Sequence, residues 1–356
     1  MTTQETRLGD IGERELTRHI QGRIPRAEVP VGVGDDAAAV NLTSPALVTA
    51  DVLVEGVHFV RDAAPPRLLG RKALTVNLSD IAAMGGVSRH AIVSLCLPPE
   101  LELSWLDSLY DGLLERAAEV GVSIVGGNVA RSPGGIVVDV TLLGEAEHPL
   151  LRSGAHPGDL VVVTGELGAA AEGVVLLRQG ARLHEDGQLS TTGVWTESSA
   201  EAVATCLRAQ LDPRPPLALA RSLAERGLAR AGMDLSDGLS SDLAEMCRQS
   251  SLGVRIEGAA LPISPAVTAL ERARGGDALQ LALHGGEDYE LLLAVGPAQF
   301  EELRELARVW GVAICGIGEF FEGEPEVRLR DNEGEHRLPV RGHDHFRADG
   351  SEASPE

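Results

Sequence analysis

Aromatic side chains are scarce in this chain of 356 residues, where Phe, Trp and Tyr together make up 3%. A core must therefore be filled by Leu, Val, Ile and Ala, and 44% hydrophobic residues suffice for a sizeable one. Lysine is scarcer still, since Lys72 stands alone and arginine carries nearly all the positive charge. The 31 basic residues face 53 acidic ones, which gives a formal net charge of −22. This balance argues against nucleic acid or an anionic membrane as the main partner.

Cysteine is also sparse, and its four copies lie far apart without a CxxC pair: Cys96, Cys206, Cys247 and Cys315. This spacing favours reduced thiols in a cytosolic protein. The amino terminus has no basic segment followed by an apolar one, and no apolar run approaches about 18 residues. We therefore expect a cytoplasmic protein with neither a secretion signal nor a membrane span.

The length of the chain indicates two domains, since a single core seldom grows beyond about 250–300 residues. Helical and strand-like patterns alternate along the sequence, which predicts an α/β (α+β) fold. A turn rich in Gly and Pro near residue 155 opens the second half. We predict one domain over residues 1–148, a second over 149–346 and a disordered polar tail over 347–356.

Apolar periodicity and Gly or Pro boundaries locate the individual elements. In the first half we expect helices over 12–20, 65–86 and 104–121, and strands over 90–98 and 135–146. Residues 46–60 predict either a strand pair or a strand followed by a bend. In the second half we expect a strand over 158–165, a helix over 167–180 and an exposed loop over 184–199.

Five short acidic motifs lie beside glycine or at the edges of apolar segments: GDD at 34–36, TAD at 49–51, LSD at 78–80, DLSDG at 234–238 and GGEDYE at 285–290. Any one of them is explained by helix caps and Asx-turns, which use aspartate freely. Loops at such edges usually carry binding groups. The repetition of Gly-Asp and Ser-Asp favours one common site.

Carboxylates that meet in such a site need cations. Two of them about 4 Å apart repel by roughly 4 kcal/mol at an effective dielectric constant near 20. Oxygen ligands without Cys or clustered His favour Mg²⁺, Mn²⁺ or Ca²⁺ over zinc. Mg²⁺ takes one or two carboxylates and completes its shell with water and phosphate oxygens. The motifs, with Asp35 and Asp36 first among them, therefore predict a site for several Mg²⁺ ions and a polyphosphate.

Other motif interpretations fit less well. Residues 32–37, GVGDDA, match G-x-G-x-x-A, and Glu55 lies near the spacing of a ribose-binding acid. A dinucleotide site needs a helix there, however, and VNLTSP at 40–45 breaks one. The G-x-x-x-x-G-K-[ST], H-E-x-x-H and G-x-S-x-G patterns are missing, which argues against a P-loop, a metalloprotease or an α/β-hydrolase.

Taken in order along the chain, the motifs resemble the thiamine-monophosphate kinase family, within the superfamily of aminoimidazole ribonucleotide synthetase. The matching stretches are GDDAAAV, TADVLVEGVHF, KALTVNLSDIAAMG, GGN, LRSGAHPGD, VTGELG, DLSDGLSSDL, GGEDYEL and GHDHF. They span roughly residues 10–346. The resemblance implies ATP-dependent phosphorylation of thiamine monophosphate to thiamine diphosphate. It also implies a homodimer whose N-terminal domains pair their sheets, with the nucleotide in a cleft beside the acidic loops.

The resemblance also assigns site residues. Mg²⁺ ligands would be Asp36, Thr49, Asp51, Asp80, Asn128, Asp234 and Asp237. ATP contacts would be Tyr110, Gly127, Asn128, Arg152 and Ser236, while His58, Glu287 and His343 would hold the thiamine substrate.

Three positions depart from the family pattern. Asn128 stands where the motif reads Gly-Gly-Asp, so a ligand there loses one negative charge. Ala50 replaces a hydroxyl residue, and His343 replaces an aromatic one. For His58 the structural alternative is a core histidine on an apolar strand, and for Glu287 and Arg152 it is a role in shaping turns.

The implied reaction is in-line transfer of the γ-phosphoryl group onto a phosphate oxygen that is already ionised, since its second pKa is about 6. The aspartates then act as metal ligands, and no residue is a proton-accepting catalyst. The alternatives are another ATP-using synthetase of the superfamily, or a non-catalytic nucleotide- or metal-binding paralogue, which Asn128 motivates. A selenophosphate synthetase would need a reactive Cys or selenocysteine near the amino terminus, and no Cys precedes Cys96.

Overall fold

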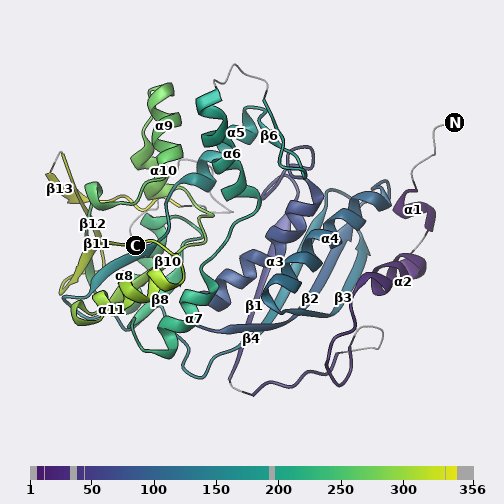
Figure 1. The fold of residues 1–356 in the computed structure, drawn as a ribbon, viewed down its shortest axis with the longest axis horizontal. Helices are drawn as coiled ribbons and strands as arrows, with labels where there is room; N and C mark the ends of the chain where they lie inside the picture. The colour runs from purple at the N-terminus through teal and green to yellow at the C-terminus, as the bar shows by residue number, and fades with distance from the viewer. Residues whose placement is uncertain are drawn as a thin grey trace. The chain divides into compact units, whose positions relative to one another are not determined.

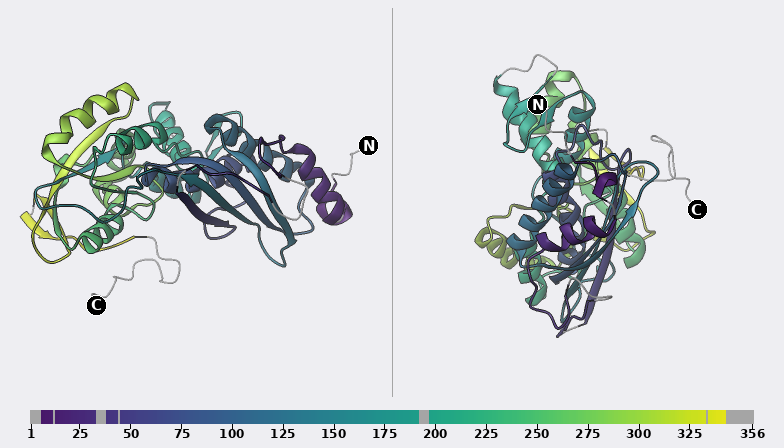
Figure 2. Two further views of the ribbon diagram at one scale, coloured as in Figure 1. Left: turned by 90° about the horizontal axis from the view of Figure 1, so that it is seen from below. Right: turned by 90° about the vertical axis from the view of Figure 1, so that its right-hand side faces the viewer.

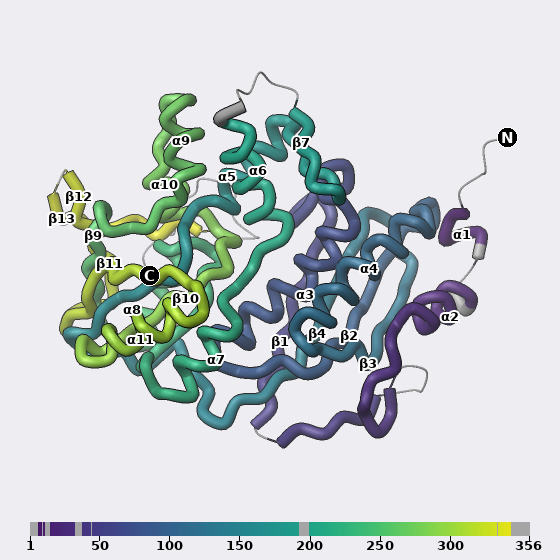
Figure 3. Tube along the Cα trace, in the orientation of Figure 1, coloured from purple at the N-terminus to yellow at the C-terminus, as the bar shows by residue number. Residues whose placement is uncertain are grey.

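The structure is a computed structural model that describes residues 6–11, 13–32, 38–43, 45–191, 197–332 and 334–342. The chain divides into two compact units, which Figures 1 and 3 trace from the amino to the carboxyl end. Unit 1 comprises residues 1–81, 86–147 and 184–188, and unit 2 comprises 82–85, 148–183 and 189–356. Both units combine helices with β-sheet, so the predicted α/β (α+β) class is confirmed.

Within its described residues, unit 1 forms a four-stranded sheet in the order β1-β4-β2-β3. β2 and β3 run parallel, and the other neighbouring strands are antiparallel. The last two residues of α3 belong to unit 2. In chain order the elements are α1 (Leu8–Ile11), α2 (Glu13–Arg23), β1 (Ala46–Val54), α3 (Pro66–Ala83), β2 (Val87–Leu97), α4 (Leu103–Val120), β3 (Ser123–Arg131) and β4 (Val137–Glu145).

Helices α3 and α4 lie side by side on one face of this sheet (Figures 1 and 2). Two glycines let their backbones touch. A Cβ added to Gly70 would lie 1.9 Å from the carbonyl oxygen of Leu109, and one added to Gly112 would lie 1.8 Å from that of Arg67. The crossing therefore fixes the position of α3, which carries the LSD motif.

Alternation along β1 gives the unit 1 sheet two different faces. Leu47 and Leu53 are buried, whereas Val48 and Val52 are 64% and 42% exposed. In the described part of the chain, the face opposite α3 and α4 thus presents apolar side chains to solvent.

Unit 2 is built around a seven-stranded sheet, counted over its described residues, in the order β13-β12-β9-β11-β5-β10-β8. Only the β12–β9 pair is parallel among the strand pairs described there. The elements are β5 (Leu160–Thr164), α5 (Ala169–Arg178), β6 (Arg182–Leu183), β7 (Leu189–Ser190), α6 (Glu197–Leu211), α7 (Leu217–Glu225), β8 (Ala231–Asp234), α8 (Leu239–Ser250), β9 (Gly253–Glu257), η1 (Gly258–Ala260), α9 (Pro265–Arg274), α10 (Ala278–His284), β10 (Leu291–Val295), α11 (Pro297–Val309), β11 (Ile314–Phe321), β12 (Val327–Asp331) and β13 (Gly334–Arg337).

The central strands of unit 2 are buried on both faces. On β5, Val161 and Val163 join a core with α8 and α10, whereas Val162 joins a second core with α7 and α11. The residues of β10 divide between the same two cores. A strand covered on both sides needs apolar residues at every position, which explains the unbroken apolar run that predicted β5.

Most predicted elements are present. Residues 46–60 form strand β1 followed by a turn, which is the second of the two expected forms. Two other segments differ from the prediction. Strand β3 was not predicted, because its two adjacent glycines weaken a strand pattern. The predicted loop over 184–199 is partly wrong, since it contains β7 and the start of α6. The tail over 347–356 lies outside the described residues, and none of the helices described is long and apolar enough to cross a membrane.

The helix crossing in unit 1 gives a stability prediction. Gly112→Ala should lower the free energy of unfolding by about 3 kcal/mol, because the new methyl group overlaps the Arg67 carbonyl oxygen. Urea unfolding followed by circular dichroism measures the change. The control is Gly22→Ala in α2, where the methyl group meets no atom within 4 Å and should be neutral or stabilising. Equal free energies of unfolding for the two variants would contradict the close approach of α3 and α4 at Gly112.

Candidate functional site

The TAD and LSD motifs meet in unit 1. The Thr49 hydroxyl on β1 donates a hydrogen bond of 2.5 Å to Oδ2 of Asp80 on α3. Asp51 lies two residues further along β1 and therefore shares the face of Thr49. Ala50 faces the other way and is exposed. A hydroxyl and two carboxylates thus lie on the helix-covered side of the sheet, as oxygen donors suited to a hard cation.

Asn128 lies on the opposite face of the same sheet. It pairs with Ser94 of β2, Ser94 pairs with Asp139 of β4, and Asp139 pairs with Val52 of β1. Residues paired directly across strands share a face, so Asn128 shares the face of Val52 and not that of Asp51. Within unit 1 the structure does not bring Asn128 to the other predicted metal ligands of this sheet.

Three motifs of unit 2 meet at one edge of its sheet. β5 ends at Thr164, β8 ends at Asp234, and β10 begins at Leu291 between them. Leu291 pairs with Asp234, and Leu292 pairs with Val163. Antiparallel pairing therefore brings the VTGELG, DLSDG and GGEDYE stretches together, although they lie more than 100 residues apart at the extremes.

The DLSDG and GGEDYE loops contact each other through their backbones. The N–H of Glu287 donates to the carbonyl of Ser236 over 2.7 Å, and that of Tyr289 donates to Leu235 over 2.8 Å. A Cβ on Gly286 would lie 2.5 Å from the Ser236 carbonyl oxygen. Gly238, with φ 111°, has equally little room, so both glycines are required by the close approach.

The GGEDYE loop carries backbone strain. Glu287 and Tyr289 have φ values of 67° and 52°, in the left-handed region that non-glycine residues seldom adopt. Such strain persists only where the surroundings enforce it, and it concentrates at functional sites. The Glu287 carboxylate is further held by Nε2 of Gln210, at 2.6 Å.

A buried acid, Asp242, lies beside the DLSDG loop. Burial raises the pKa of Asp242 to about 8, and the charges of Asp237 and Asp234 add to the rise. One Asp242 oxygen accepts the N–H groups of Asp237, at 3.2 Å, and Gly238, at 3.1 Å. Asp237 and Asp234 are therefore near enough for their charges to act on Asp242, and a nearby cation would favour its ionised form.

Two more acids are buried in the GGEDYE loop. Burial raises the pKa of Asp288 to about 8, although both its oxygens accept the N–H of Gly168, the residue before α5. Burial likewise raises the pKa of Glu290 to about 7, although Thr164 donates a hydrogen bond of 2.5 Å to its carboxylate. Sequence reasoning did not single out Asp242, Glu290 or Gln210 for the site; the first two stand inside the quoted motifs, whereas no motif contains Gln210.

The remaining predicted residues are dispersed. His58 lies in a turn after β1 and not on a strand, which corrects our expectation. Its Nδ1 accepts the N–H of Val54 at 3.0 Å, so the neutral ring carries its proton on Nε2. Arg152 lies on an exposed bend, and Gly127 is exposed on β3. Tyr110 is 2% exposed on α4, where burial raises its pKa.

Asp35, Asp36 and His343 lie outside the described residues. The dinucleotide interpretation of residues 32–37 requires a helix directly after the glycines, but residues 38–43 are not helical. The Glu55 carboxylate is bound to Arg61, at 2.9 and 2.7 Å, and to the N–H of Ile136, at 2.8 Å. Glu55 therefore holds a loop in place.

Across the residues that the structure covers, no three His, Cys, Asp or Glu side chains are grouped as they would be around a metal ion. What each unit offers is a partial set of oxygen donors. In unit 1 these are Thr49, Asp51 and Asp80, and in unit 2 they are Asp234 and Asp237.

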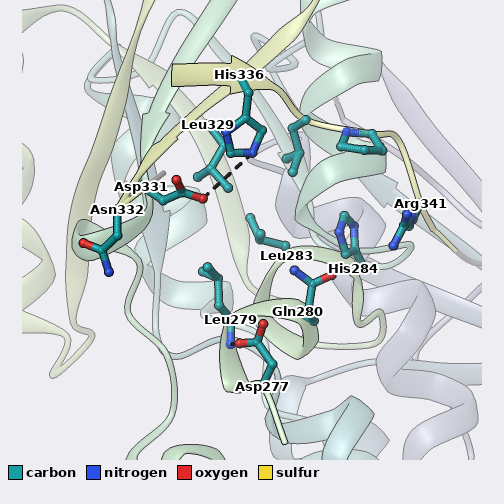
Figure 4. A pocket seen from close by; sticks show the side chains of 12 residues that line it. Asp277, Leu279, Gln280, Leu283, His284, Leu329, Asp331, Asn332, His336 and Arg341 are labelled. Carbon is teal, nitrogen blue, oxygen red and sulfur yellow. Dashed lines mark hydrogen bonds and ion pairs between the residues drawn. The ribbon is translucent and has the colours of Figure 1, made fainter. Parts of the chain in front are cut away.

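A separate cavity of about 420 Å³ opens in unit 2 beside α10, β12 and β13 (Figure 4). Its wall combines leucines with a larger number of polar side chains, among which His336 and Asp331, 3.8 Å apart, face it together. Its lining contains no residue predicted for the site. His284 and Arg341, which do line it, stand immediately before the GGEDYE and GHDHF motifs.

Comparison with known proteins identifies the class. Residues 34–146 match the AIR synthase related protein N-terminal domain, and residues 156–330 match the corresponding C-terminal domain. The chain is 36% identical to the thiamine-monophosphate kinase of Synechococcus elongatus over 352 residues, which cover 95% of this chain and 98% of that one.

Solved structures agree with this class. Thiamine-monophosphate kinase from Stenotrophomonas maltophilia K279a is 31% identical with a TM-score of 0.75, over 88% of this chain and 94% of that one. AaThiL complexed with AMPPCP and TMP is 31% identical with a TM-score of 0.74, over 96% and 99%. The chain belongs to the thiamine-monophosphate kinase family of AIR synthase related proteins, which confirms the resemblance of the motifs.

The buried Glu290 predicts a pH-dependent stability. Its folded pKa of about 7 lies above the ordinary value of 4.5, so ionisation destabilises the fold as pH rises from about 4.5 to 7. Glu290→Gln keeps an acceptor for Thr164 but cannot ionise. Relative to wild type, its free energy of unfolding should therefore increase across that window by roughly 1–3 kcal/mol.

Urea unfolding at several pH values in metal-free buffer measures this difference. The exposed Glu322→Gln serves as the control for loss of one carboxyl group. If the free energies of unfolding of Glu290→Gln and wild type differ by the same amount from pH 4.5 to 8, the pKa of Glu290 is not raised in the folded protein.

Proposed function

We propose that this chain is an enzyme that transfers the γ-phosphoryl group of ATP to thiamine monophosphate and so forms thiamine diphosphate. The observation that carries the proposal is the close contact of the DLSDG and GGEDYE loops at one sheet edge, where Glu287 has a strained backbone. The bound AMPPCP, an analogue of ATP, and TMP in the AaThiL structure support this choice of substrates.

We propose that Mg²⁺ is the metal of this site. The donors are all oxygens, which a hard divalent cation such as Mg²⁺ prefers. When bound, Mg²⁺ would neutralise phosphate charge and align the two phosphorylated molecules. The proposed ligands are Asp36, Thr49, Asp51, Asp80, Asp234 and Asp237, whereas Asn128 is left out because it lies on the opposite face of the unit 1 sheet.

The remaining site residues are proposed to bind the two substrates. ATP would contact Tyr110, Gly127, Asn128, Arg152 and Ser236, and thiamine monophosphate would contact His58, Glu287 and His343. The fixed tautomer of His58 supports its role, because it leaves Nε2 as the proton-bearing nitrogen. We propose domains over 1–148 and 149–346, and a cytoplasmic location, which the four free cysteines support.

No strong general base is required by this reaction. The attacking atom is a phosphate oxygen that is already ionised near neutral pH. The work of the protein is to hold two polyanions in line and to compensate their charge. We therefore assign the aspartates to metal binding and none to proton transfer.

An activity assay tests the function. Purified protein with ATP, Mg²⁺ and thiamine monophosphate should form thiamine diphosphate, detected by chromatography. Asp80→Asn should reduce turnover by roughly 100-fold or more, while unfolding is unchanged because the amide oxygen still accepts the Thr49 hydroxyl. The exposed Asp186→Asn serves as the control.

Three results would count against the proposal. Near-normal turnover of the Asp80→Asn variant would show that Asp80 is not an essential ligand of the metal. ATP binding without turnover by the wild type would favour the non-catalytic paralogue. ATP consumption that needs a different acceptor would favour another synthetase of the superfamily.

We further propose that the chain forms a homodimer through the uncovered face of the unit 1 sheet. Val48 and Val52 are exposed on that face, next to the half-buried Leu143 and Ile92 of the neighbouring strands. Adjacent apolar side chains on an open sheet commonly mark an interface, and a two-fold axis makes such a patch self-complementary.

Light scattering after size-exclusion chromatography tests the dimer. The wild type should have twice the chain mass of 37.4 kDa, whereas Val48→Asp combined with Val52→Asp should elute as a monomer. Val309→Asp, at an exposed valine of α11, is the control and should remain dimeric. A monomeric wild type, or a dimeric double variant, would disprove this interface.

A further inference from the structure

Gln210 is a buried polar residue that no motif contains. It lies in the last turn of α6 and is 4% exposed. Its Nε2 donates to Oε2 of Glu287 over 2.6 Å, across 77 positions of the chain. Its Oε1 has no hydrogen-bond partner among the described residues. Buried polar atoms are nearly always paired, and the hydrogen bond from Nε2 to Glu287 is the pairing that this amide makes. We therefore take this bond as the reason for a glutamine at position 210.

The packing of α5 against α6 fixes the position of Gln210. These helices lie side by side (Figure 1). A Cβ on Gly173 of α5 would lie 2.4 Å from the Cys206 carbonyl oxygen and 2.7 Å from Cβ of Gln210. The two backbones therefore approach as closely as a glycine allows, so the packing of α5 against α6 fixes the position of the Cβ atom of Gln210.

Glu287 is thus constrained at both ends. Its backbone has a φ of 67° and donates to the Ser236 carbonyl, while its carboxylate accepts from Gln210. An amide donor orients a carboxylate without neutralising it, unlike Arg or Lys. The group that Gln210 orients is a carboxylate, which attracts a cationic ligand. Thiamine monophosphate offers a cationic thiazolium ring and an amino group on its pyrimidine, and both favour such a partner.

We propose that Gln210 is a positioning residue, which orients the Glu287 carboxylate toward the thiamine part of the substrate. This inference rests on the proposed function. It predicts that loss of the amide weakens the use of thiamine monophosphate and leaves the use of ATP unaffected, because the residue acts only through Glu287.

Steady-state kinetics of the full-length enzyme test it. Gln210→Leu should raise the KM for thiamine monophosphate about tenfold, while the KM for ATP changes less than twofold. Gln210→Asn keeps the amide but is one methylene too short, so it should show the same split and serves if the leucine variant does not fold. The matched control is Gln249→Leu, which breaks a 2.6 Å bond between Gln249 and Glu245 on the surface.

A double-mutant cycle isolates the route through Glu287. In a Glu287→Gln background, Gln210→Leu should change the KM for thiamine monophosphate less than twofold further, because the partner that it positions is already altered. If Gln210 had only a structural role, Gln210→Leu would raise the KM for thiamine monophosphate by the same factor in the wild-type and Glu287→Gln backgrounds.

The outcomes separate the two hypotheses. If the wild type forms no thiamine diphosphate, the proposed function fails. If the wild type is active, the inference alone is overturned by any of three results: an unchanged KM for thiamine monophosphate in both Gln210 variants, an equal rise of both KM values, or the full additional loss in the Glu287→Gln background.

Discussion

Carboxylates held side by side repel one another, and the edge of the unit 2 sheet collects Asp234, Asp237 and Asp242 within reach of each other's charge. The surrounding fold holds these carboxylates in place despite their repulsion. Backbone N–H groups of the DLSDG loop bond to Asp242, and glycines allow the neighbouring loop to approach. This grouping of acids underlies our proposal that the site receives cations and, through them, anionic phosphates.

The sheet of unit 2 supplies the rigidity that this arrangement requires. Its central strands are covered on both faces, so the ends of β5, β8 and β10 are held by two cores. Strain at Glu287 and Tyr289 is tolerated because backbone bonds tie both residues to the DLSDG loop. Unit 1 repeats the principle on a smaller scale, where the Thr49 hydroxyl links a strand to Asp80 on a helix held at a glycine crossing.

The sequence predicted the class of fold and the family, because periodicity and glycine-flanked acidic motifs are local signals. The sequence was a poorer guide to which distant residues lie together in the folded chain. Asn128 lies on a strand that its glycines concealed, and the sheet register, invisible in the sequence, turns it away from Asp51. Gln210 was missed for a different reason. Its partner is 77 positions distant, and an isolated glutamine in an amphipathic helix carries no distinguishing pattern.

The proposed function requires that the aspartates bind a divalent cation. A metal-binding measurement tests this requirement without relying on turnover. Mn²⁺ can stand in for Mg²⁺, and electron paramagnetic resonance reports its free concentration during titration in the presence of AMPPCP. We predict that Asp234→Asn weakens Mn²⁺ binding at least tenfold relative to wild type while the Tm of the metal-free protein does not fall. Equal Mn²⁺ affinity in the two proteins would contradict the central role assigned to these carboxylates.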